Sequence, residues 1–164
     1  MNILDEINYN IWAENVFFDA IASLSDEQWQ SKENILNKSI QQIYAHKTEV
    51  MWYWFSECVE GKSQEDMPDY NNMSISEMRK SLIGILNDKK KYLEKHTDKD
   101  LELNIWWIKQ PYKVSAQELI YNGLNHNSYH RGQIAILIRR LDIKLDDVDY
   151  NPYMHQKLGL EYTE

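Results

Sequence analysis

The chain contains few residues that break or crosslink a fold. Of its 164 residues, one is cysteine, three are proline and five are glycine. A single cysteine forms no disulfide within the chain, which is typical of proteins in a reducing compartment, so we expect a cytoplasmic protein. The scarcity of proline and glycine favours long helices over short strands joined by turns.

Basic residues and long apolar runs are also scarce. Lys and Arg number 18 against 26 Asp and Glu, so the formal net charge is −8. We therefore expect no nucleic-acid partner, because phosphate contacts require a basic surface. No apolar run approaches the roughly 20 residues of a membrane span, and the N-terminal residues lack the basic start of a signal peptide. The length predicts a single helical domain over residues 1–164.

Aromatic residues are plentiful but unevenly chosen, with 6 Trp and 11 Tyr against 3 Phe. Trp and Tyr carry a polar atom on an apolar ring, so they suit the edge of a core or a half-wet cleft. Composition alone does not separate these two locations.

Four stretches place apolar residues every three or four positions, which predicts helices. They cover residues 4–24, 39–61, 74–96 and 115–141. Three of them begin with a capping box, in which a Ser and a later Gln or Glu satisfy each other's free backbone donors: Ser39 with Gln42, Ser74 with Glu77, and Ser115 with Glu118. Gly61 is a predicted helix C-cap. We expect a loop over 62–73, a hairpin or irregular excursion over 100–114, and an all-α four-helix bundle.

Three histidines interrupt the apolar stripes of two predicted helices. His46 lies between Ile43 and Val50, while His126 and His130 lie four residues apart on the last helix. Imidazoles at positions i and i+4 can reach one metal ion. A single inward histidine is more often a hydrogen-bonded core residue, but three together are too costly to bury as accidental packing. The pattern favours a metal site formed by these three histidines.

Other candidates carry weaker signals. Glu49, one turn after His46, is a candidate catalytic residue that orients a ligand or takes a proton, and the alternative is a solvated helix carboxylate. Asn10 and Asn125 are candidates for the same cleft, and Gly123 indicates a close approach by another helix or a substrate. We expect His96 to end a basic helix, Cys58 to act as a small apolar residue, and His155 to lie in a tail that folds over the mouth of the bundle.

The segment His126-Asn-Ser-Tyr-His130-Arg-Gly-Gln133 resembles the H-x-x-x-H-R-G-Q signature of the DinB/YfiT-like metalloprotein superfamily. His46 matches the lone histidine that this family places on its second helix, and the opening around Trp12 is also similar. The resemblance implies an up-down-down-up arrangement of the bundle and a homodimer. It further implies a divalent ion, commonly zinc or nickel, held by His46, His126 and His130. Arg131 and Gln133 then fix helix packing or an interface.

Three histidine ligands leave at least one metal position open, as in catalytic rather than structural sites. Such a metal lowers the pKa of a bound water or thiol. Two enzyme classes follow, both acting on a small molecule: a hydrolase, or a transferase that uses a low-molecular-weight thiol as co-substrate. The alternative is a metal-binding or sensing protein of the stress response without turnover. We also expect some of the aromatic residues near His46 and within residues 100–114 to form the walls of a pocket around the metal.

Overall fold

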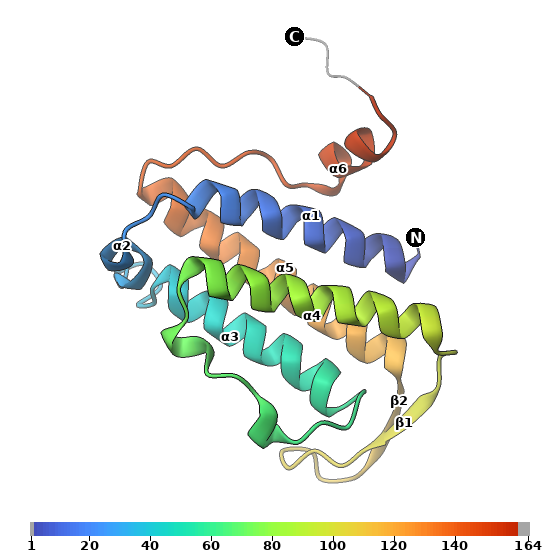
Figure 1. Cartoon of the computed structure of the whole chain (residues 1–164). Coiled ribbons are helices and arrows are strands. Elements are labelled where there is room, and N and C mark those ends of the chain that lie inside the picture. Colours follow the sequence, from blue (N-terminus) through green and yellow to red (C-terminus); the bar gives the residue numbers. More distant parts are fainter. Residues whose placement is uncertain (1, 161–164) are drawn as a thin grey trace.

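A computed structural model describes residues 2–160 of the chain. Four long helices lie side by side (Figure 1): α1 (Ile3–Ile21), α3 (Ile40–Trp52), α4 (Ile75–Lys95) and α5 (Ala116–Arg140). In this view α1 and α5 run in one direction and α3 and α4 in the other. The closest packing joins α3 to α5 and α1 to α4. The prediction of a mainly helical protein is confirmed.

The helices begin where the capping boxes predict. In α3, α4 and α5 the N-cap serine accepts a backbone N–H while the Gln or Glu side chain accepts the serine's own N–H. The predicted ends are less accurate, since α1 ends at Ile21 and α3 ends at Trp52. A π-helical turn, η1 (Tyr53–Glu57), continues from α3. Gly61 follows with a φ of +76°, which agrees with its predicted capping role.

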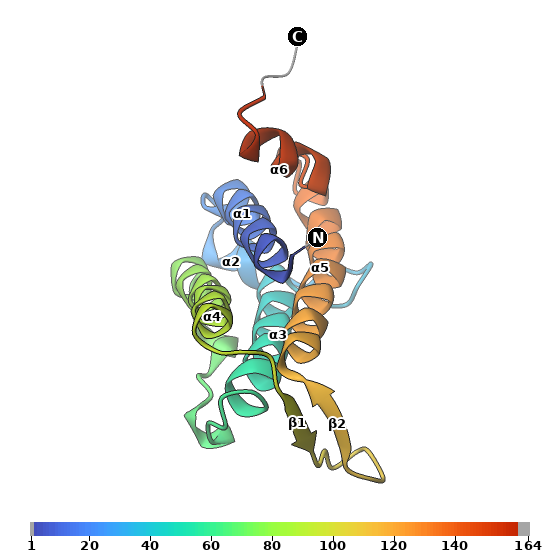
Figure 2. The ribbon, with the colours of Figure 1, turned by 90° about the vertical axis from the view of Figure 1, so that its right-hand side faces the viewer.

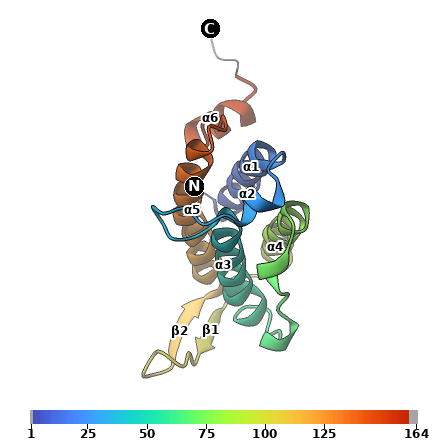
Figure 3. The same cartoon turned by 90° about the vertical axis from the view of Figure 1, so that its left-hand side faces the viewer.

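Several short helical elements were not predicted, because they are too short to show a periodic spacing of apolar residues. Between α1 and α3 lies α2 (Asp26–Gln30), with its own capping box from Ser25 to Gln28. The predicted loop over 62–73 contains two 3-10 turns, η2 (Gln64–Asp66) and η3 (Tyr70–Asn72). The tail contains α6 (Tyr150–Lys157). Figure 3 shows α6 outside the four long helices, next to α1.

The segment before the last helix forms a two-stranded hairpin, one of the two expected outcomes. Strand β1 (Asp100–Leu103) pairs antiparallel with β2 (Tyr112–Ser115), so that Leu101 lies opposite Val114. The hairpin projects away from the four helices (Figure 2). Its connecting loop carries Trp106 and Trp107, two large apolar side chains that remain exposed.

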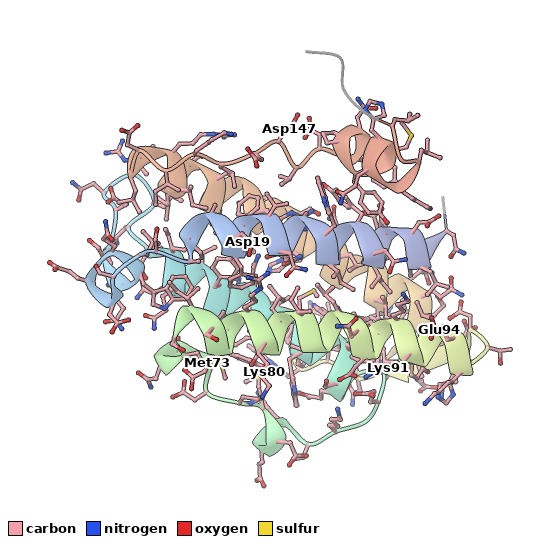
Figure 4. All side chains as sticks on the ribbon, turned by 45° about the horizontal axis from the view of Figure 1, so that its top comes forward. Asp19, Met73, Lys80, Lys91, Glu94 and Asp147 are labelled. Atoms are coloured by element: carbon pink, nitrogen blue, oxygen red, sulfur yellow. The ribbon has the colours of Figure 1, made fainter. Side chains whose placement is uncertain are left out.

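The apolar core lies between the four long helices and is closed at one end by α2. Trp29 from α2 and Phe18 from α1 both contact the ring of Tyr44 in this core. Most charged side chains lie on the outside of the helices, as Figure 4 shows for Lys80, Lys91 and Glu94 of α4. No helix within residues 2–160 is long and apolar enough to cross a membrane.

Candidate metal centre

The structure brings the three predicted histidines together between two helices. His46 comes from α3, and His126 and His130 come from consecutive turns of α5. One ring nitrogen of each lies within 4.8 Å of the other two. The ring centroids of His126 and His130 are 4.4 Å apart, and that of His46 is 5.3 and 4.9 Å from them. These three side chains could hold one metal ion.

The surroundings keep these histidines neutral. Burial lowers the pKa of His46 and His130, and it lowers the pKa of His126 to about 4, with further contributions from the charges of His130, His46 and Lys47. The Nε2 atoms of His126 and His130 are buried and have no hydrogen-bond partner within residues 2–160. A buried polar atom without a partner is costly unless a ligand uses it. Neutral imidazoles with free lone pairs are what a divalent cation requires.

Gln133 orients one of the three rings. Its Oε1 lies 2.7 Å from Nδ1 of His130. An amide oxygen only accepts hydrogen bonds, so this contact places the imidazole proton on Nδ1 and leaves Nε2 free to bind a metal. We expected Gln133 to fix helix packing or an interface. Its hydrogen bond instead orients a histidine of the candidate metal site.

Each of the three histidines is followed in the sequence by a member of a buried polar cluster, which we call the Glu14 cluster (Asn10, Glu14, Lys47, Asn127 and Arg131). Lys47 Nζ donates to Glu14 Oε2 at 2.7 Å, and Asn127 Nδ2 donates to Glu14 Oε1 at 2.9 Å. Arg131 Nη1 donates to Asn10 Oδ1 at 2.7 Å and lies 3.3 Å from Glu14 Oε1. All five side chains are buried.

The Glu14 cluster joins α1, α3 and α5 directly behind the histidines. It confirms a packing role for Arg131, and it corrects the prediction that Asn10 lies at the cleft, because Asn10 is bonded within the cluster. Sequence patterns did not predict a role for Glu14, Lys47 or Asn127. Their charged and amide side chains lie on the buried faces of helices, which is a detectable signal only once those faces are known.

The DinB family model matches residues 2–162, nearly the whole chain. The chain belongs to the DinB family. No curated protein matches it. The resemblance drawn from the histidine motif is therefore confirmed, while the homodimer that it implies stays a prediction.

Other candidate residues of this DinB-family chain lie away from the histidines. Glu49 is not part of the close group, and its Oε1 accepts a hydrogen bond from Asn71 Nδ2 at 3.3 Å. Asn125 is exposed on the outside of α5. His96 caps the end of α4, as expected, and stacks on Tyr92. His155 lies on α6.

Within residues 2–160, the tail packs against α1 and not over the histidines. The rings of Tyr150 and Tyr153 contact Tyr9 of α1, and Tyr153 also contacts Trp12. Cys58 is half-buried, and burial raises the pKa of its thiol, which agrees with the expectation of a small apolar residue.

Gly123, one turn before His126, faces a buried lysine. A Cβ at this position would lie 2.8 Å from Lys89 Nζ and 3.3 Å from Met51 Sδ. The close approach predicted at Gly123 is therefore made by a side chain of α4. Lys89 is fully buried, and its ammonium contacts the sulfur of Met51 at 3.2 Å. Within the described residues it has no carboxylate partner, and burial lowers its pKa to about 7.

The aromatic residues expected around the histidines in this DinB-family chain lie in several different places. Tyr44 and Trp52 are buried in the core, whereas Tyr129 is exposed. Tyr53, Trp54, Trp106 and Trp107 line a hollow of about 340 Å³ together with Glu49. None of the three histidines lines this hollow. The aromatic hollow therefore lies along α3 from the histidines and is not the metal-centred pocket that we expected.

Proposed function

We propose that this DinB-family protein is a metal-dependent enzyme that transfers a low-molecular-weight thiol to a small electrophilic molecule. His46, His126 and His130 hold one divalent ion, zinc or nickel, in this proposal. Such an ion supplies acidity to a bound thiol, so that the thiolate is present at neutral pH.

One observation carries the proposal. The close group contains three histidines and no fourth His, Cys, Asp or Glu within residues 2–160. A structural zinc site has four protein ligands, whereas a catalytic site has three and leaves one position for water or substrate. The donor set therefore supports an open site and argues against a purely structural metal.

The protein's own residues prepare this site before a substrate arrives. Gln133 holds the proton of His130 on Nδ1, so that Nε2 carries no proton and can bind a metal ion. Burial keeps all three rings neutral, so that a metal ion does not have to displace protons at neutral pH. In the transfer itself, the thiol proton goes to solvent, a sulfur–carbon bond forms, and the bond to the leaving group breaks with its electron pair.

Hydrolysis is the second candidate, and Glu49 is the observation that favours it. Its charge acts on His46 from one turn away on α3, raising the pKa of that ring against the larger effect of burial. A carboxylate so placed is a candidate base for activating water. The thiol transferase is preferred because this carboxylate lies outside the close group of histidines.

Two further proposals rest on the family. We propose that α1, α3, α4 and α5 form the up-down-down-up bundle of the DinB/YfiT-like proteins, which the directions of the four helices support. We also propose a homodimer, for which light scattering of the purified protein is the direct measurement.

The test combines metal content with thiol consumption. The protein is loaded with Zn²⁺ or Ni²⁺, dialysed, and incubated with bacillithiol, mycothiol or glutathione and the electrophile 1-chloro-2,4-dinitrobenzene. We expect metal-dependent thiol consumption and nearly one ion per chain in the wild type. His130→Ala should lose both, whereas His96→Ala, which alters a histidine at the end of α4, should retain both.

Other outcomes separate the alternatives. Hydrolysis of generic esters or amides without thiol consumption, abolished by Glu49→Gln, would replace the transferase by a hydrolase. Bound metal without turnover of either kind would support the binding or sensing protein. Unchanged metal content in His46→Ala, His126→Ala and His130→Ala would overturn the metal site itself.

A further inference from the structure

The aromatic hollow lies on the face of α3 that also carries His46. His46, Glu49, Val50 and Tyr53 follow the spacing i, i+3, i+4 and i+7, so they line one side of the helix. At 1.5 Å per residue, the hollow begins about 5 Å along the helix from His46. A small molecule that occupies it can therefore extend toward the histidines.

Three separate segments contribute aromatic and apolar walls to this hollow. Tyr53 and Trp54 come from η1, a π-helical turn of a kind that is frequent at functional sites. Trp106 and Trp107 come from the tip of the hairpin, and Met67 comes from the loop after η1. Figures 1 and 2 show the hairpin beyond the end of α3, where it can supply such a wall.

Most of these rings meet at large angles, and the exception is Tyr53 with Trp107, whose centroids are 5.9 Å apart at 40°. Trp54 and Trp107 are 6.3 Å apart at 89°, and Tyr53 and Trp54 are 5.0 Å apart at 74°. Trp106 and Trp107 meet at 87°. Rings at such angles present faces as well as edges to their surroundings, and a ring face carries negative charge density. Trp106 is 90% exposed and Trp107 48%, which is unusual for side chains of this size.

The charge of the lining has one sign. Among the described residues that line the hollow, Glu49 is the only carboxylate, and none is Lys, Arg or His. Within the described residues, the one hydrogen-bond donor recorded for Glu49 is the Asn71 amide, at 3.3 Å. A carboxylate next to several ring faces disfavours an anion and favours a weakly hydrated cation, because aromatic faces and the carboxylate attract it together.

We propose that this aromatic pocket binds the ammonium group of a small organic cation, whose other end reaches the histidines. The rings of Trp54 and Trp107 contact the methyl or methylene groups around the nitrogen, and Glu49 neutralises its charge. The role of this cation as a substrate depends on the proposed enzyme function, but its binding does not, because no pocket residue is one of the three histidines.

The test measures binding without metal, so that it is independent of catalysis. Choline and its neutral isostere 3,3-dimethylbutan-1-ol have nearly the same shape and differ in charge. Each is titrated into metal-free His130→Ala protein, and the indole N–H signals of tryptophan are followed by NMR. We expect choline to bind about fivefold or more tightly than the alcohol, the scale of one cation–aromatic contact.

Variants then assign the binding to the pocket. Glu49→Gln, Trp107→Leu and Trp106→Leu should each weaken choline binding several-fold. Glu94→Gln and Tyr121→Leu change exposed residues elsewhere and should not. If choline and the alcohol bind equally well, the pocket is only apolar and the proposal is overturned. Binding of neither probe would also overturn it. Selective choline binding in a protein that consumes no thiol would leave this proposal intact and refute the proposed thiol transfer.

Discussion

Two buried polar regions lie back to back on α3 and α5, and they differ in how their polar atoms are satisfied. In the Glu14 cluster, both oxygens of the carboxylate accept hydrogen bonds from Lys47, Asn127 and Arg131. Among the histidines, two buried Nε2 atoms have no partner in the described chain. The same two helices therefore carry one region whose charged groups are paired and one that is open. In the Glu14 cluster only the Oδ1 atom of Asn127 is buried without a partner within residues 2–160.

The difference separates groups that hold the fold from groups that are available for a ligand. Paired buried charges fix how helices pack, and removal of one partner leaves the others uncompensated. Unpaired buried nitrogens contribute nothing to the fold and become useful only when something binds them. Because each histidine precedes a cluster residue in the sequence, the paired region positions the open one. Four substitutions test this contrast.

The largest effect is expected in the Glu14 cluster. Glu14→Gln retains the shape of the side chain but leaves Lys47 and Arg131 without their shared carboxylate. We expect a loss of about 3–5 kcal/mol in the free energy of unfolding, the usual effect of removing one partner of a buried ion pair. Urea denaturation followed by circular dichroism measures it.

A matched change on the surface serves as the control for Glu14. Glu94→Gln alters an exposed carboxylate of α4, labelled in Figure 4, and should change stability by less than about 0.5 kcal/mol. If both variants lost equally little, the Glu14 cluster would not be what holds α1 to α3 and α5.

Lys89 extends the contrast to a buried cation with no carboxylate. Its pKa is about 7, against 10.5 for an exposed lysine. Between these values the unfolded chain binds a proton that the folded protein does not, so stability should increase with pH by about 1 kcal/mol per unit. Lys47, with a pKa of about 8, contributes in the same direction.

Lys89→Met removes the first of these contributions. We expect a more stable protein at pH 7 and a clearly smaller increase in stability between pH 7 and 10, measured by urea denaturation at each pH. Lys91→Met, at the exposed position labelled in Figure 4, should retain the wild-type pH dependence. The groups around the Lys89 ammonium are Met51, Phe55 and Gly123, none of which titrates. An unchanged slope in Lys89→Met would contradict the assignment.

The sequence predicted the local features of the fold and the site, but not the contacts between helices that are distant in the chain. The helix starts followed from local capping boxes, and the three histidines followed from their positions on apolar faces and from the family motif. The pairing of Glu14 with Lys47 was not predictable, because it joins two helices through residues that are 33 positions apart in the chain. The π-helical turn that begins at Tyr53 was not predictable either, because the apolar spacing of a helix continues through it without a break.

Gln133 provides the next test, because it links the open region to its own helix. Gln133→Leu removes the acceptor that holds the His130 proton, and we expect metal affinity to decrease about 10- to 100-fold. Gln133→Glu retains an acceptor at this position and should restore most of the affinity. Competition with a chromogenic chelator measures both variants, and Gln117→Leu on the same helix is the control. Equal losses in the Leu and Glu variants would show that Gln133 acts through packing instead.

The smallest effect on folding is expected among the histidines themselves. His126→Leu removes a buried nitrogen that has no partner. At pH 7 the free energy of unfolding of the metal-free variant should therefore lie within about 1 kcal/mol of the wild-type value, or above it. The pH dependence has a definite sign. His126 has a pKa of about 4 when folded and about 6.5 when unfolded. As pH falls through this range the unfolded chain takes up the proton first, so the wild type loses stability that the variant retains. Urea denaturation of both metal-free proteins at pH 7, 6 and 5 measures the difference. A large loss at pH 7 would mean that the histidines hold the fold as the Glu14 cluster does, and the contrast between the two regions would fail.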